Sequence, residues 1–311
     1  MSGDAIQIKS LNKTYAASGK AARKVALKDV DLSIPKGSIF GLLGPNGAGK
    51  STIINIMAGL VVKTSGSVKI WDMDIDENPR GCRAAIGVVP QEINFDPFFT
   101  PLKLLDIQAG LYGVPKCERR SRDLLALVGL EEQGHSYTRS LSGGMKRRLM
   151  VAKALVHTPP VLVLDEPTAG VDVELRQMLW KKVRDLRDQG VTVLLTTHYL
   201  EEAEELCDRI AIINHGEIVA NDETENLLAR IESKEIRFRL AKEFSDIPEG
   251  LKKFQAQKEG RRTLMVRYSP EDQCVGEIIS LLQKSGHEIH DISTEESDLE
   301  DVFLQITRSA E

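Results

Sequence analysis

Apolar and polar positions alternate along the first part of the chain with the two-residue period of β-strands. The clearest runs are residues 6–11 and 25–34, and a third strand-like run at 38–43 follows a Pro-Lys-Gly turn at 35–37. The third run leads into a glycine-rich segment, after which apolar residues recur at helical spacing over residues 52–60. The pattern therefore predicts a strand, a glycine loop and a helix in direct succession.

The pattern changes to helical spacing over about residues 100–155, and strands and helices alternate after residue 160. The alternating elements are a strand at 161–165, a helix at 174–189, a strand at 191–196, a helix at 199–208 and a strand at 210–213. Strands that alternate with helices form largely parallel sheets covered on both faces. The sequence therefore predicts an α/β core.

Beyond about residue 225 the periodicity weakens and charged residues become more frequent. We expect strands at 235–240, 263–268 and 287–292, and helices at 272–284 and 298–307. These elements describe a small α+β extension of roughly 80 residues. The sequence thus predicts a main domain over residues 5–225 and an extension over residues 226–311.

Composition narrows the function classes. The 311 residues are 41% hydrophobic and 28% charged, with a net charge of -5, which argues against nucleic-acid binding through bulk basicity. The four cysteines are far apart, which is typical of reduced thiols in a cytosolic protein. We see no signal-peptide pattern and no apolar run approaching the roughly 20 residues of a membrane-spanning helix. We therefore expect any role at a membrane to come through a partner.

The glycine-rich segment is a complete phosphate-binding loop pattern. It reads Gly44-Pro45-Asn46-Gly47-Ala48-Gly49-Lys50-Ser51-Thr52. Its glycines let backbone N–H groups close around phosphate oxygens, and the following helix adds its positive N-terminal dipole. We expect Lys50 to hold the β- and γ-phosphates of a nucleotide and Ser51 to supply a hydroxyl to Mg²⁺.

Two carboxylates end the apolar strand at 161–165. Asp165 is placed to complete the Mg²⁺ shell, and Glu166 to orient or deprotonate the attacking water, which is worth ~10²–10⁴-fold in rate. His198 follows the next strand, so it is expected at the same edge of the sheet, where ligands bind. Gln91 follows a strand-like run at 86–89 and is a weaker candidate.

Tyr15 is the candidate for stacking on adenine through its ring. A basic segment at 16–24 follows it, and if that segment displaces Tyr15, Val25 becomes the main adenine contact instead.

The segment Leu141-Ser142-Gly143-Gly144-Met145 separates this chain from other phosphate-loop enzymes. Together with GPNGAGKST, Gln91, VLVLDEP, Val171-Asp172 and His198, it makes residues from about 5 to 225 resemble the nucleotide-binding subunit of an ABC transporter. The resemblance implies a P-loop core with a mainly parallel sheet, an N-terminal antiparallel subdomain and a helical subdomain at about 95–158. It also implies ATP and Mg²⁺ as ligands.

The resemblance further implies that two copies pair head-to-tail as a homodimer, with each ATP between the phosphate loop of one copy and the LSGG segment of the other. Ser142, Gly143 and Gly144 open a helix, and their amides would meet the γ-phosphate across the interface. By the same resemblance, Gln91 senses Mg²⁺ and the membrane partner, and His198 contacts the γ-phosphate. Asp172 bridges the two sites.

Finer features are similar to ABC-2 type ATPases of the daunorubicin-exporter and nodulation-factor-exporter-like group. These features are LSGGMKRRL, PTAGVD followed by ELR, THYLEEAE, and SDLEDVFL at 297–304. This group pairs with a separate multi-spanning ABC-2 permease. The similarity therefore implies that this chain drives export and lies on the cytoplasmic face of the membrane. Met145 stands where the family most often has glutamine, and the subgroup tolerates methionine there.

Three interpretations stay open at the level of sequence. A soluble ABC ATPase acting on ribosomes or DNA, or an importer subunit, are the alternatives to an exporter, although no nucleic-acid partner is expected. The basic run at 146–148 is expected on a solvated or dimer-facing helix. The aromatic loop at 94–99 is expected either to dock a permease helix or to pack beneath the helical subdomain. The transported substrate is not readable from this chain.

Overall fold

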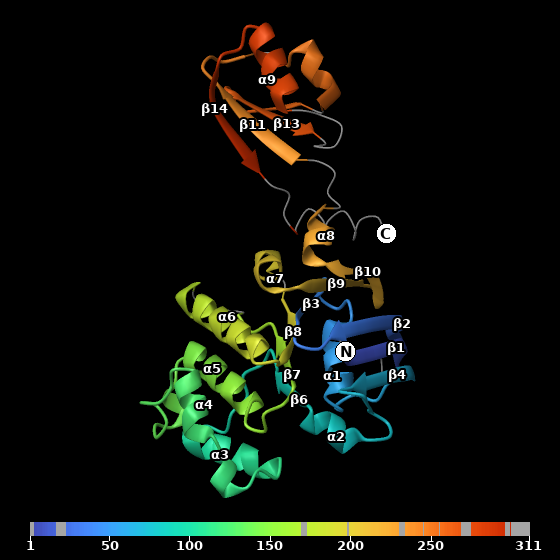
Figure 1. Ribbon diagram of the computed structural model, residues 1–311, viewed down its shortest axis with the longest axis vertical. Helices are drawn as coiled ribbons and strands as arrows, with labels where there is room; N and C mark the ends of the chain where they lie inside the picture. The colour runs from blue at the N-terminus through green and yellow to red at the C-terminus, as the bar shows by residue number, and fades with distance from the viewer. Residues whose placement is uncertain are drawn as a thin grey trace. The chain divides into compact units, whose positions relative to one another are not determined.

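A computed structural model describes residues 3–16, 23–168, 173–197, 199–229, 234–244, 246–254, 256–268, 275–295 and Leu299. The chain divides into two compact units, residues 1–223 and 224–309 (Figure 1). Each unit has a hydrophobic core of its own. Within the described part of the chain, no helix has the length and apolar character needed to cross a membrane.

The first unit is built on a six-stranded sheet with the order β10-β9-β3-β8-β7-β6. The strands are β3 (Ile39–Leu43), β6 (Ile86–Val89), β7 (Val161–Asp165), β8 (Thr192–Thr196), β9 (Arg209–Asn214) and β10 (Glu217–Glu223). All neighbours pair in parallel except β9 and β10, which are antiparallel. Strands β3, β7 and β8 are buried along their whole length, which explains their continuous apolar sequences.

A second, antiparallel sheet of the first unit has the order β2-β1-β4-β5. Its strands are β1 (Asp4–Tyr15), β2 (Lys24–Pro35), β4 (Ser65–Ile70) and β5 (Met73–Asp74). Buried side chains of both sheets and of helix α1 (Lys50–Met57) form one core, in which Ile6, Phe40 and Ile53 are completely buried. This shared core fixes the antiparallel sheet beside the strand that leads into the glycine loop.

Helices cover the other side of the central sheet. Figure 1 shows α5 and α6 across β6, β7 and β8 from α1. The remaining helices of this unit are α2 (Pro79–Ala84), α3 (Pro101–Leu111), α4 (Ser121–Leu127), α5 (Gly143–Ala154), α6 (Val173–Asp188) and α7 (Leu200–Leu206), with short 3₁₀ turns at Lys116–Glu118 and Thr138–Ser140. Helices α3, α4 and α5 contact one another and form the helical part predicted from the sequence.

The second unit is a four-stranded antiparallel sheet of order β12-β13-β11-β14 with helices against it. Its elements are α8 (Thr224–Ala229), β11 (Lys234–Leu240), the 3₁₀ helix Glu249–Phe254, β12 (Gln257–Glu259), β13 (Thr263–Tyr268), α9 (Val275–Lys284) and β14 (Ile289–Glu295). Phe238, Phe254 and Ile278 are completely or almost completely buried in its core. The unit is α+β, as the alternation of short strands and helices predicts.

Several element boundaries differ from the predicted ones. Helix α1 begins at Lys50, two residues before the predicted start, because the glycine loop turns directly into the helix. Strand β14 begins at Ile289 because the N–H of His287 still donates to Leu282 O at the end of α9, 3.1 Å away. Strands β4, β5, β10 and β12 and helices α2 and α8 were not predicted. The predicted helix at 298–307 lies outside the described residues, apart from Leu299.

Candidate functional site

The glycine loop between β3 and α1 is held open by residues that cannot carry a side chain. A Cβ atom on Gly44 would overlap the carbonyl oxygen of Ile213. Gly49 has φ +125°, and a Cβ there would lie 2.8 Å from Leu27 Cδ2 and 3.0 Å from Ala26 O. The two positions therefore require glycine, because the loop lies tightly against β9 and β2 and then opens toward α1.

The ammonium group of Lys50 lies inside this loop. Lys50 is only 6% exposed, and its Nζ donates to Gly44 O at 2.6 Å and to Pro45 O at 3.2 Å. Burial lowers the pKa of Lys50, while the nearby carboxylates of Glu166 and Asp165 act in the opposite direction. The loop thus surrounds a buried cation at the start of helix α1, and glycine loops that lead into a helix are a common site for phosphate groups.

Asp165 is the last residue of the buried strand β7. Thr196, the last residue of the neighbouring strand β8, donates its hydroxyl to Asp165 Oδ1 at 2.5 Å. Burial raises the pKa of Asp165, whereas the Thr196 hydroxyl and the charge of Lys50 lower it. A carboxylate held by one hydroxyl beside a phosphate loop suits a magnesium ion, since this hard cation prefers oxygen ligands and keeps bonds to water and phosphate.

Glu166, the next residue, occupies a backbone conformation that residues with a side chain seldom adopt. Its φ is +47°, and its N–H donates to Thr196 O at 3.0 Å, with the Thr196 hydroxyl oxygen 3.2 Å away. Gln91, which follows β6, donates from Nε2 to Glu166 Oε2 at 2.8 Å. The structure therefore brings Gln91 and Glu166 together, although they are 75 residues apart.

The LSGG segment begins helix α5. Leu141 is buried, and Ser142 is the N-cap residue, with its Oγ accepting from the N–H of Met145 at 3.2 Å. Ser142 and Gly143 are exposed. The first amides of the helix therefore face solvent, which suits an anion that arrives from outside this chain.

Tyr15 and Val25 lie on neighbouring strands, at the end of the β1–β2 hairpin where the connecting segment leaves β1 and enters β2. Tyr15 pairs with Lys24 and Thr14 with Val25, and the two candidate side chains are 38% and 46% exposed. Ala26, next to Val25, forms the wall against Gly49 described above. Val25 is thus one residue away from a contact with the phosphate loop. The ring of Tyr15 lies 4.7 Å from Lys13 Nζ.

Comparison with known proteins identifies the architecture. The ABC transporter family model matches residues 27–169. The chain is 38% identical over 225 residues to Nod factor export ATP-binding protein I of Cupriavidus pinatubonensis, covering 72% of this chain and 67% of that protein. It is 39% identical over 228 residues to linearmycin resistance ATP-binding protein LnrL of Bacillus subtilis, covering 73% and 71%.

The chain belongs to the ABC transporter family. It is an ATP-binding protein and an ATPase, and the predicted similarity to nodulation-factor exporters is confirmed. Among solved structures, a dimeric ATP-binding cassette in a post-hydrolysis state, bound to ADP and Pi, matches with a TM-score of 0.64 at 30% identity. That match covers 70% of this chain and 98% of the cassette.

One residue of this ABC ATPase site was not found from its sequence. Arg147 of α5 is 5% exposed and donates from a guanidinium nitrogen to Pro90 O at 2.9 Å, directly before Gln91. Burial lowers its pKa, while Asp165 and Glu166 raise it. The expectation that residues 146–148 form a solvated or dimer-facing run is therefore wrong for Arg147. Its burial follows from a contact between α5 and the loop after β6, which helical spacing does not reveal.

The structure describes only some of the remaining candidate residues. His198 and Asp172 lie outside the described residues of the ABC ATPase, whereas Thr197 before His198 is buried. Among the described residues, no cluster of three or more His, Cys, Asp or Glu side chains forms a metal site. The proposed oxygen donors for Mg²⁺ are Ser51, Gln91 and Asp165, which fits an ion whose other ligands are phosphate and water.

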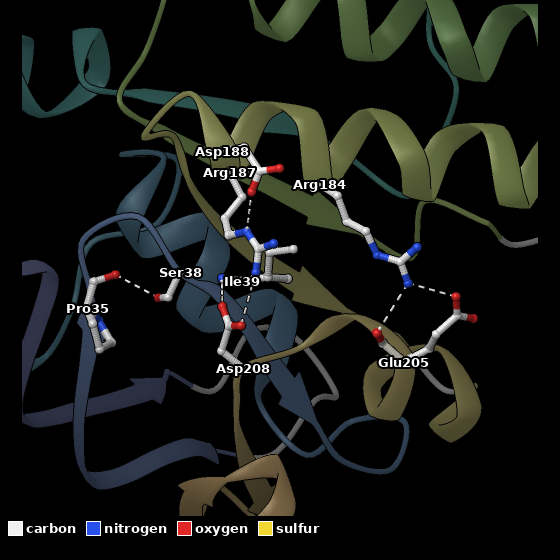
Figure 2. Close-up of polar contacts among 8 residues, drawn as sticks. All are labelled: Pro35, Ser38, Ile39, Arg184, Arg187, Asp188, Glu205 and Asp208. Atoms are coloured by element: carbon white, nitrogen blue, oxygen red, sulfur yellow. Dashed lines mark hydrogen bonds and ion pairs between the residues drawn. The ribbon is translucent and has the colours of Figure 1, made fainter.

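Polar contacts fix the helices of the ABC ATPase around strand β3. Figure 2 shows Asp208 accepting from the N–H of Ile39 at 2.8 Å and approached by Arg187 at 3.3 Å. It also shows Arg184 of α6 donating to the carboxylate of Glu205 of α7 at 2.7 Å. Helices α6 and α7 are therefore tied to each other and to the start of the strand that ends in the phosphate loop.

Proposed function

We propose that this ABC ATPase works as one half of a head-to-tail homodimer and drives export through a separate membrane permease. The proposal is carried by the solvent-facing LSGG segment at the start of α5. Because α5 lies across the central sheet from α1 (Figure 1), the amides at Ser142 and Gly143 need the phosphate loop of a second copy. The dimeric cassette and the export ATPases among the relatives support the same arrangement.

Each group at the sheet edge has a defined task in this scheme. The loop amides and Lys50 bind the β- and γ-phosphates. On binding, Lys50 Nζ exchanges its hydrogen bonds to the carbonyl oxygens of Gly44 and Pro45 for hydrogen bonds to phosphate oxygens. Ser51, Gln91 and Asp165 would hold Mg²⁺, which would supply positive charge to neutralise the phosphates. Glu166 accepts the proton of the water that attacks the γ-phosphate, and Gln91 holds one oxygen of that carboxylate in place. ADP and phosphate are the products.

Glu166→Gln tests the base assignment. The amide keeps the size and the contact with Gln91 but does not take a proton, so we expect turnover to fall by about 10²-fold or more while ATP binding is retained. ATP-dependent dimerisation, measured by size-exclusion chromatography, should then be prolonged because the nucleotide is not cleaved. A variant that hydrolyses ATP at the unsubstituted rate would refute the role of Glu166.

The permease contact is proposed at the aromatic loop before α3. Phe98 is 69% exposed, so packing beneath the helical subdomain does not account for it. Thr138 anchors this loop by donating its hydroxyl to Asp96 O at 2.7 Å and its N–H to Phe99 O at 2.9 Å. Thr138 lies just before the LSGG segment, so a partner bound to the loop is linked to the ATP-binding helix. This contact would hold the ATPase on the cytoplasmic face of the membrane.

The double variant Phe98→Ala/Phe99→Ala should release the permease without lowering ATP affinity. We expect co-purification with the permease and transport to be lost together, because the exposed aromatic area is removed. Val62→Ala is the matched control, since Val62 is also highly exposed but follows α1. Retention of both co-purification and transport in the double variant would rule out this docking site.

A further inference from the structure

The buried carboxylate of Glu202, on α7, connects the segments that follow the two central strands. Glu202 is 3% exposed. The hydroxyl of Thr168 lies 2.8 Å and 2.9 Å from its two oxygens, and the hydroxyl of Thr197 donates to Oε2 at 2.9 Å. Thr168 stands two residues after Glu166, and Thr197 directly follows Thr196. One carboxylate therefore holds both chain segments that leave the catalytic edge of the sheet.

A buried carboxylate needs compensation for its lost hydration, and Glu202 has it. Arg176 Nε of α6 lies 3.2 Å from Glu202 Oε1, close enough for an ion pair although without hydrogen-bond geometry. The Arg176 guanidinium also lies 5.0 Å from the centre of the Tyr199 ring. Helices α6 and α7 thus hold the Glu202 carboxyl group between Arg176 and the two threonines.

The backbone at Glu166 has a particular need for such support. Its positive φ is unfavourable for a residue with a Cβ and persists only where the surroundings hold it. On one side Thr196 accepts from the Glu166 N–H, and on the other side Thr168 is held by Glu202. Both contacts depend on the segment at the end of β8. Thr196 belongs to this segment, and the next residue, Thr197, donates its hydroxyl to the Glu202 carboxylate that also holds Thr168.

We propose that Glu202 is a positioning residue for ATP hydrolysis, which fixes Thr168 and Thr197 and thereby the backbone that carries Glu166. The inference rests on the proposed role of Glu166 as the base. It assigns to Glu202 no contact with ATP or with the attacking water. Glu202 should therefore affect the rate of the chemical step and leave the binding of nucleotide largely unchanged.

Glu202→Gln is the first test. The amide has one acceptor oxygen in place of two and puts an NH₂ donor in the other position, against Thr168 and either Arg176 or Thr197, so the hydrogen bonds that hold the two threonines are weakened. We expect kcat to fall about 10- to 100-fold, as small misplacements of reacting groups do. The dissociation constant for a non-hydrolysable ATP analogue should stay within about twofold. Glu205→Gln is the matched control on the same helix, because Glu205 is exposed and pairs with Arg184 (Figure 2). It should leave kcat unchanged.

Thr168→Val and Thr168→Ser give a second test that does not alter the buried charge. Valine removes the hydroxyl at constant shape and should lower kcat as Glu202→Gln does, while serine keeps the donor and should restore it. The combination of Thr168→Val with Glu202→Gln should cost little more than either change alone, because both break the same link. This pair also carries the test if Glu202→Gln does not fold.

Hydrogen exchange gives a readout that is independent of turnover. In the free protein, the Glu166 amide should exchange faster in Glu202→Gln and Thr168→Val than in Glu205→Gln or Thr168→Ser. Unchanged kcat in the first two variants would overturn the proposal, as would a loss of analogue binding or of melting temperature in proportion to kcat. These outcomes differ from a failure of the proposed role of Glu166 as the base. In that case the Glu166→Gln variant, in which Glu202 is unchanged, would keep full activity.

Discussion

At the scale of single residues, Gly47 and Gly49 separate two requirements of the phosphate loop. Both have positive φ, +82° and +125°, but an added Cβ has open space at Gly47 and meets Leu27 and Ala26 at Gly49. We expect Gly49→Ala to lower the free energy of unfolding by about 1–3 kcal/mol, because strain and overlap add. Gly47→Ala should cost about 1 kcal/mol from backbone strain alone.

Urea denaturation of the two alanine variants measures this difference. Gly49→Ala should also weaken ATP binding, because the loop has to move away from β2. Equal losses of stability in the two variants would show that backbone conformation alone, and not the approach of Ala26 and Leu27, demands glycine at position 49.

The site residues that could be proposed from the sequence are those whose neighbours along the chain indicate a task. Lys50 belongs to a local pattern, and Asp165 and Glu166 follow a recognisable buried strand. The hydrogen bond from Gln91 to Glu166 and the burial of Arg147 depend on contacts between distant segments. Glu202 was part of a motif in the sequence, but its role as an acceptor for two threonines was visible only in the structure.

At the scale of elements, the helices and strands with a strong periodicity of apolar residues could be located from the sequence, whereas those with a weak periodicity could not. The strand predicted at 161–165 and the helix predicted at 174–189 have clear apolar patterns. In the structure the bounds of both elements agree with the predicted bounds to within one residue. Strand β5 has only two residues and β12 only three, and all three residues of β12 are exposed. Short or exposed strands form because a neighbour pairs with them, so their own side chains show little alternation.

The junction of α3 and α5 predicts a pH dependence of stability. The rings of Tyr112, after α3, and His157, after α5, are stacked with centres 3.7 Å apart. His157 Nε2 lies 3.2 Å from Ile86 O, while its Nδ1 is buried without a hydrogen-bond partner among the described residues. Burial lowers the pKa of His157 below the value of about 6.5 that it has in the unfolded chain.

The unfolded chain therefore binds a proton that the folded protein excludes, and the free energy of unfolding falls as pH falls through about 6.5. His157→Phe keeps a ring on Tyr112 and removes the titration. The melting temperature of the unsubstituted protein should fall more between about pH 8 and pH 5.5 than that of the variant. At pH 8 the histidine is neutral in both states, so its titration contributes nothing to the difference between the two proteins there, and any remaining difference reflects the lost contact with Ile86 O. Parallel pH profiles would exclude His157 as the cause.

At the scale of the whole molecule, the order of strands in the central sheet could not be predicted from their order in the chain. Strand β3 lies between β8 and β9, whose paired residues are 154 and 169 positions further along the chain. This pairing brings the phosphate loop beside Thr196 and Asp165. The alternation of strands and helices predicted a parallel sheet, but many strand orders satisfy it. The gathering of the site at one edge is a property of this order.

The proposed head-to-tail dimer makes a prediction that a self-contained site does not share. Lys50→Ala should disable the phosphate loop. Ser142→Asp should place a negative charge against the γ-phosphate while keeping the N-cap of α5, because aspartate caps as well as serine. Each variant alone should be inactive. In a mixed dimer both defects fall in one site and the other site is intact, so an equal mixture should recover about a quarter of the unsubstituted activity.

The matched control is the mixture of Lys50→Ala/Ser142→Asp with the unsubstituted chain. A mixed dimer in this control also has one substituted and one unsubstituted copy of both the phosphate loop and the LSGG segment. Each of its two sites now carries one defect. Activity should then come only from unsubstituted dimers, again about a quarter, and should not rise when the doubly substituted chain is in excess. If ATP were held by the loop and the LSGG segment of one chain, two inactive single variants would stay inactive however they were mixed. Recovery on mixing is therefore the outcome that requires each copy to complete the site of the other.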